Sequence, residues 1–107
     1  MSDARIEAMM YWQGFEGVRL ENGVLKEVGH APPHVILSEG IIGLSRSCFS
    51  GQADLEWVVL PSNLQFVDEY VFSNCPKLTI IGIYAGQERF KNNLLYGNVA
   101  ELCLRRR

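Results

Sequence analysis

The chain of 107 residues is 48% apolar and 21% charged, with a formal net charge of −2. This length fits one domain, near the lower limit for a self-sufficient hydrophobic core. The acidic balance disfavours nucleic acid and anionic membranes as partners, and no apolar run reaches the ~20 residues that a membrane-spanning helix needs.

The two ends and the cysteines add further expectations. A basic start followed by an apolar run is missing, so we expect no secretory signal and a cytoplasmic protein, or an extracellular one if the chain is truncated. Cys48, Cys75 and Cys103 are odd in number and widely spaced, unlike a disulfide framework or a zinc site. Two prolines separate His30 from His34. We therefore expect no metal and no cofactor.

Residues 1–14 form a predicted N-terminal arm. Ser2 is suited to cap a helix that carries Ile6, Met9 and Met10 on one face, and a glycine at position 14 would end it. A frayed arm and an added edge strand are the alternatives.

Residues 15–34 are predicted to form an opening β-hairpin. Val18 and Leu20 alternate with polar residues, and the apolar run returns over 24–28. Between them lies Asn22-Gly23, which favours the positive φ angles of a type I′ turn.

Residues 35–83 repeat with an offset of 23 residues. The apolar positions of 35–58 coincide with those of 58–81, and Phe-Ser-Gly-Gln at 49–52 recurs as Phe-Ser-Asn-Cys at 72–75. Such a period is typical of stacked units that cannot bury an apolar face alone. The pattern predicts a β-rich repeat solenoid of right-handed coils, with about three short parallel strands and the two phenylalanine rings stacked inside.

Residues 84–107 form a predicted C-terminal cap and basic tail, in which the repeat degrades. A short amphipathic helix is expected over 87–94, with Phe90 and Leu94 four residues apart. The Asn-Cys turn has no counterpart in this cap. The apolar segment 99–104 is either a closing strand or a helical turn, and Arg105–Arg107 are expected to be solvated.

Two runs carry a family resemblance. Glu-Trp-Val-Val-Leu-Pro-Ser-Asn-Leu at 56–64 and Glu-Tyr-Val-Phe-Ser-Asn-Cys-Pro-Lys-Leu at 69–78 resemble BspA-type leucine-rich repeats of bacteria and some protists. The resemblance covers about residues 18–83. The chain departs from the family pattern at Ser38, where proline is usual, and at 51–52, where cysteine is usual. The resemblance implies a binding scaffold without catalytic apparatus.

Strand residues that alternate with the inward-facing ones should form an outward, concave row. This row consists of His34, Ile36, Trp57, Val59, Ile80 and Gly82. An exposed apolar row that includes tryptophan is typical of a protein-binding surface. We predict a non-catalytic protein–protein interaction module that binds an unidentified protein through this concave strand face.

Two alternatives stay open. The N-terminal arm, with Met9, Met10, Tyr11 and Trp12, could fold over the concave row and complete the core. The chain could also be a self-assembling structural protein, because about three coils bury little area and a homodimer through the same patch or the open end would add more.

Enzymatic chemistry has little support in the sequence. Asp68 and Glu69 are adjacent, so their side chains diverge on a strand, unlike a paired acid and base. Ser45 or Ser47 could form a dyad with a histidine, but no spacing demands it. No phosphate loop or nucleophile elbow is present. The basic tail alone does not indicate a nucleic-acid partner.

Overall fold

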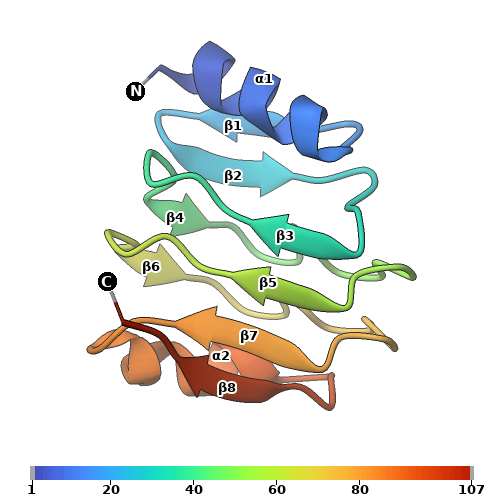
Figure 1. The fold of residues 1–107 in the computed structure, drawn as a ribbon, viewed down its shortest axis with the longest axis vertical. Helices are drawn as coiled ribbons and strands as arrows, with labels where there is room; N and C mark the ends of the chain where they lie inside the picture. The colour runs from blue at the N-terminus through green and yellow to red at the C-terminus, as the bar shows by residue number, and fades with distance from the viewer. Residues whose placement is uncertain (1, 107) are drawn as a thin grey trace.

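The computed structural model describes residues 2–106 as two four-stranded β-sheets closed at one end by a helix (Figure 1). The elements in chain order are α1 (Asp3–Gln13), β1 (Arg19–Glu21), β2 (Val24–Glu27), β3 (His34–Ile36), β4 (Gly43–Leu44), β5 (Trp57–Val59), β6 (Phe66–Val67), β7 (Ile80–Ile83), the 3-10 helix η1 (Gln87–Phe90), α2 (Lys91–Leu95) and β8 (Glu101–Leu104). One sheet has the order β1-β2-β4-β6 and the other has the order β3-β5-β7-β8.

The N-terminal arm adopts the helical alternative. The backbone N–H of Arg5 donates to the Ser2 hydroxyl at 3.4 Å, which makes Ser2 the N-cap. Gly14 ends the helix in the left-handed conformation, with φ 106°. Ile6 and Met10 are fully buried, whereas Met9 is exposed. The apolar face that packs on the core is therefore narrower than predicted.

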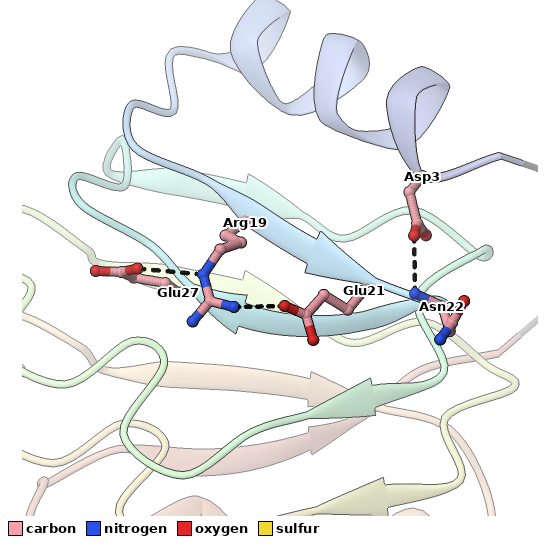
Figure 2. Close-up of polar contacts among 5 residues, drawn as sticks. All are labelled: Asp3, Arg19, Glu21, Asn22 and Glu27. Atoms are coloured by element: carbon pink, nitrogen blue, oxygen red, sulfur yellow. Dashed lines mark hydrogen bonds and ion pairs between the residues drawn. The ribbon is translucent and has the colours of Figure 1, made fainter.

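Helix α1 is fixed at both ends by side chains that bind backbone groups of the sheets. The carboxylate of Asp3 accepts a hydrogen bond from the Asn22 N–H at 2.8 Å (Figure 2) and another from the Gly23 N–H at 2.9 Å. At the other end, the Gln13 amide donates to the Ile36 carbonyl at 3.0 Å and accepts from the Ile36 N–H at 3.2 Å. Helix α1 thus lies across the end of the stack that is formed by the first strands of the chain, next to β1 (Figure 1).

The opening hairpin is confirmed. Strands β1 and β2 pair antiparallel, with Glu21 opposite Val24. Asn22 and Gly23 have φ angles of 50° and 80°, as a type I′ turn requires. On the exposed side, the Arg19 guanidinium contacts Glu21 at 2.7 Å and Glu27 at 3.5 Å (Figure 2).

The 23-residue period is confirmed by the strand register. β3 pairs with β5, and β5 with β7, in parallel, so that Val35, Val58 and Ile81 lie side by side and are fully buried. The rings of Phe49 and Phe72, also fully buried, stack with centroids 5.1 Å apart. Each repeat therefore contributes one equivalent layer to a shared core.

Each repeat also contains a second short strand that the sequence analysis did not predict. β4 pairs with β2 and with β6, in parallel, with Gly43 opposite Phe66 and Leu44 opposite Val67. These two-residue strands are too short for an alternation pattern to reveal. Their pairing closes the side of the molecule opposite β3, β5 and β7.

The turn that follows Phe49 recurs in the next two layers, after Phe72 and Leu95. Gly51, Asn74 and Gly97, spaced by 23 residues, have φ angles of 78°, 56° and 78°. Glycine and asparagine are the residues that adopt this left-handed conformation at least cost. Because the turn recurs at Gly97, the expected loss of this turn in the C-terminal cap is wrong.

The residue after each of these turns bonds to a carbonyl of the preceding layer. The Gln52 side chain donates to the Val28 carbonyl at 3.2 Å, Cys75 to that of Phe49 at 3.2 Å, and Asn98 to that of Phe72 at 3.2 Å. Glutamine and asparagine thus take the place that cysteine has in the middle repeat. The departure at 51–52 preserves the contact with a different side chain.

After Ile83 the chain forms η1 and α2 in place of a second strand, with Leu94 fully buried. The segment 99–104 adopts the strand alternative, since β8 pairs in parallel with β7. Ile80 lies opposite Glu101, a distance of 21 residues along the chain. The segment from the turn at Gly97 to the start of β8 is two residues shorter than the segment from Asn74 to β7. A strict 23-residue comparison therefore does not detect this fourth strand.

Candidate functional site

The outer surface of the β3-β5-β7-β8 sheet carries the six residues that the sequence analysis selected. Its side chains form two columns across the strands, because paired residues on parallel strands point to the same side. We call this surface the outward face. One column is His34, Trp57, Ile80 and Glu101, and the other is Ile36, Val59, Gly82 and Cys103.

The apolar members of the outward face differ in exposure. Ile36 is 58% exposed and Ile80 is 45% exposed, while Trp57 is partly buried. Val59, by contrast, retains only 7% exposure, and Gly82 is buried. The accessible apolar surface is therefore concentrated at Ile36 and along Trp57 and Ile80, and is not continuous over all six residues.

Trp57 is held in place by His34 on the neighbouring strand. The two rings stack nearly parallel, with centroids 5.0 Å apart and an interplanar angle of 9°. The His34 imidazole Nε2 lies 3.3 Å from a carboxylate oxygen of Glu56, which fixes the direction of the imidazole ring. Because the stack restrains the indole, Trp57 presents a defined edge and loses little conformational freedom when a partner binds.

Gly82 is covered by the side chain of Arg105. A Cβ atom at position 82 would lie 2.8 Å from the Arg105 Cδ and 3.2 Å from a Val59 methyl group. The space that a side chain would fill here is thus already filled by the aliphatic part of the arginine. Arg105 thus takes part in the outward face, while Arg105 and Arg106 are both exposed, as expected for the tail; Arg107 lies outside the described residues.

Ile36 borders a shallow hollow at the junction of α1 and β3. The hollow is lined by Met9, Gln13, Ile36, Leu37, Ser38 and Glu39. Neither Gln13 nor Met9 was a predicted site residue. No local sequence pattern indicates these two residues, since their contact with β3 depends on how α1 packs across the strand end.

The N-terminal arm does not cover the outward face. Ile6 and Met10 enter the core, and α1 lies across the end of the stack beside β1. Because the Trp12 side chain is itself 90% exposed, it does not pack over Trp57 or Ile80. The alternative in which the arm completes the core over this face is therefore wrong.

The remaining candidate groups lie apart from one another. His30 Nε2 lies 3.1 Å from a carboxylate oxygen of Asp54. This pair is separate from the pair that His34 forms with Glu56. Burial raises the pKa of Cys48 to about 12 and also raises that of Cys75, so both thiols stay protonated at neutral pH and are poor nucleophiles.

Residues 2–106 contain no cluster of three or more histidine, cysteine, aspartate or glutamate side chains suited to a metal ion. Within the same residues, no helix is long and apolar enough to cross a lipid bilayer.

Comparison with known proteins agrees with this arrangement. Residues 32–102 match the family described as BspA type Leucine rich repeat region (6 copies). No curated protein and no solved structure matches the chain. The family match spans about two thirds of the sequence, and the chain belongs to this family of leucine-rich repeat proteins. Such repeats generally mediate protein–protein interactions and are typically non-catalytic.

Proposed function

We propose that this chain is a non-catalytic interaction module that binds a protein partner through the outward face. Ile36, Trp57 and Ile80 would supply the apolar contacts, and His34 the polar rim beside them. Val59 and Gly82, which are buried, would form the base of this binding surface. The single observation that carries the proposal is the exposure of Ile36 and Ile80 beside a restrained tryptophan.

Two physical arguments support this proposal. An isoleucine on a sheet surface with half of its area exposed gains ~25 cal/mol for each Å² that a partner covers. A tryptophan that is already restrained is a frequent energetic anchor of interfaces. The flat outer surface of a parallel sheet, with side chains about 4.8 Å apart between strands, offers such contacts in register.

We also propose that the repeats wind as a single-domain, right-handed solenoid. The connection between two parallel strands of the same sheet is right-handed in nearly all proteins, because of the twist of the strands. In such a solenoid β3, β5 and β7 lie on one wall and β4 and β6 on the other. A crystal structure with left-handed connections would contradict this arrangement.

The partner proposal is tested with Ile80→Glu and Ile36→Glu, each of which places a charge on the outward face. A partner first identified with the wild-type chain should bind each variant at least about tenfold more weakly, because a buried unpaired carboxylate is costly. Both side chains are exposed, so melting temperatures should stay within a few degrees of wild type. Isothermal titration calorimetry measures the affinity, and circular dichroism measures the melting temperature.

Trp12→Ala is the control for position, since Trp12 is exposed and apolar, as Ile36 and Ile80 are, but lies on α1. Its affinity for the partner should equal that of the wild-type chain. If both glutamate variants retain the partner while Trp12→Ala loses it, the binding surface is α1 and the proposal for the outward face is wrong.

A further inference from the structure

The C-terminal end of the β3-β5-β7-β8 sheet has an open strand edge. Among residues 2–106, β8 pairs only with β7. The N–H groups of Glu101 and Arg105 donate to the carbonyls of Thr79 at 2.9 Å and Ile83 at 2.7 Å. Successive backbone groups point to opposite sides of a strand, so those of Leu102 and Leu104 point away from β7. An edge of this kind is a template for another strand.

The opposite edge of the same sheet, on β3, is occupied at Ile36. There the Gln13 amide occupies both the N–H and the carbonyl of Ile36 on β3. Helix α1 lies across that end (Figure 1). Within residues 2–106, a side chain therefore occupies the β3 edge at Ile36, whereas the β8 edge is left available for pairing.

The side chains of β8 lack the covering layer that earlier strands have. Leu104 occupies the register position of Ile83, yet it is 60% exposed whereas Ile83 is buried. Leu102, opposite Ile81, is partly buried. On the outward face, β8 presents Glu101 and Cys103, and Arg105 follows directly after the strand; all three are exposed.

We propose that β8 pairs antiparallel with β8 of a second copy of this chain, about a two-fold axis at Cys103. In this register the backbone N–H and carbonyl groups of Leu102 in each chain form hydrogen bonds with those of Leu104 in the other chain. Glu101 of each chain then lies opposite Arg105 of the other, on the same side of the joined sheet, and the Arg105 side chain turns from its place over Gly82 toward that carboxylate. On the inner side of the joined sheet, the Leu102 side chain of each chain packs against the Leu104 side chain of the other.

Charge complementarity selects this register over its neighbours. A shift that places Leu102 opposite Leu102 brings Glu101 opposite Cys103, and the opposite shift brings Arg105 opposite Cys103. The first shift leaves both charges without a partner. The second leaves Arg105 without one and moves Glu101 opposite position 107, beyond β8, whereas the proposed register forms two cross-strand ion pairs within residues 101–105. A two-fold pairing uses the same edge on both chains, so the assembly stops at a dimer and does not grow into a fibre.

Charge reversal tests the proposed register. Glu101→Arg and Arg105→Glu each place like charges opposite one another at two positions, and each should weaken the dimer at least about tenfold. The double variant Glu101→Arg/Arg105→Glu recreates both ion pairs and should restore dimerisation. An equimolar mixture of the two single variants should form mixed dimers for the same reason. Sedimentation velocity at low ionic strength measures each affinity.

Arg5→Glu is the matched control, because it changes the net charge as Arg105→Glu does but lies at the other end of the molecule, on α1. It should leave the dimer unchanged. Melting temperatures verify that each variant folds. A wild-type chain that stays monomeric up to millimolar concentration overturns the proposal, and so does a dimer that is insensitive to both single reversals.

A thiol cross-link tests the position of the axis independently. With oxidised glutathione added, two Cys103 thiols at the axis should give up two protons and two electrons to form a disulfide, releasing two molecules of reduced glutathione. Cys48 and Cys75 are buried and should not react in the folded protein. The cross-linked dimer is measured by non-reducing electrophoresis.

Cys103→Ser should abolish the cross-link. Cys103→Ser/Ala8→Cys keeps one exposed thiol but moves it to α1, and should cross-link much more slowly than the wild-type chain. Equal rates for this variant and the wild-type chain would show that random collision forms the disulfide, and the proposed axis would then be wrong.

Discussion

At the scale of single residues, the repeat depends on a few positions where backbone conformation restricts the side chain. Positions 51, 74 and 97 all have a positive φ and are occupied by glycine or asparagine. The sequence showed the recurrence of Phe-Ser-Gly-Gln as Phe-Ser-Asn-Cys, but it did not reveal that Gly97-Asn98 forms the same turn. The dipeptides Gly51-Gln52, Asn74-Cys75 and Gly97-Asn98 differ in residue type. Their equivalence lies in the positive φ angle of the first residue and in the hydrogen bond from the second residue to the preceding layer.

Asn74→Ala is expected to destabilise the protein by about 1 kcal/mol, because an alanine strongly disfavours the left-handed conformation. Asn74→Gly is the matched control and should lie within about 0.5 kcal/mol of wild type, since glycine adopts this conformation freely. Urea unfolding followed by circular dichroism measures both free energies. Equal midpoints for the alanine and glycine variants would contradict the role assigned to this φ angle.

At the scale of elements, α1 acts as a cap for the N-terminal end of the stack. Its two polar anchors, Asp3 on the hairpin turn and Gln13 on β3, lie at opposite ends of the helix. The sequence predicted a capped helix as one option among three. It did not predict the anchors, because each one joins residues 19 or more positions apart and leaves no local pattern.

Gln13→Ala should expose the edge of β3. The Ile36 N–H loses its hydrogen-bond acceptor, so its hydrogen exchange should become at least about tenfold faster, with a loss of about 1 kcal/mol in the free energy of unfolding. Amide exchange followed by nuclear magnetic resonance measures this rate. The amide of Val58, on the central strand β5, should keep its protection, and equal acceleration at both sites would indicate global destabilisation instead.

At the scale of the whole molecule, the layers share one continuous core. Phe15, Phe49 and Phe72 follow one another in contact, with ring centroids 6.2 Å apart for the first pair and 5.1 Å for the second. Buried residues from α1 to α2 belong to a single hydrophobic cluster. With so few layers, none has enough neighbours to remain folded alone, so unfolding should be cooperative.

Phe72→Ala should therefore lower the stability of the entire chain by about 3–5 kcal/mol, with one transition and not two. Phe66→Ala, the matched control, removes a ring that is 40% exposed and should cost less. Tryptophan fluorescence and far-ultraviolet circular dichroism should report the same midpoint for each variant. Separate midpoints would show that the layers unfold independently.

The sequence by itself determined the 23-residue period, the inward apolar positions, the opening hairpin and the family. These features repeat locally, and side-chain alternation and turn chemistry express them within a few residues. Only the tertiary structure decided that Val59 and Gly82 are covered while Ile36 and Ile80 are exposed, that α1 caps the end of the stack, and that β8 adds a fourth strand. Burial at those positions depends on contacts between residues far apart in the chain, such as Arg105 on Gly82, and no local pattern encodes such contacts.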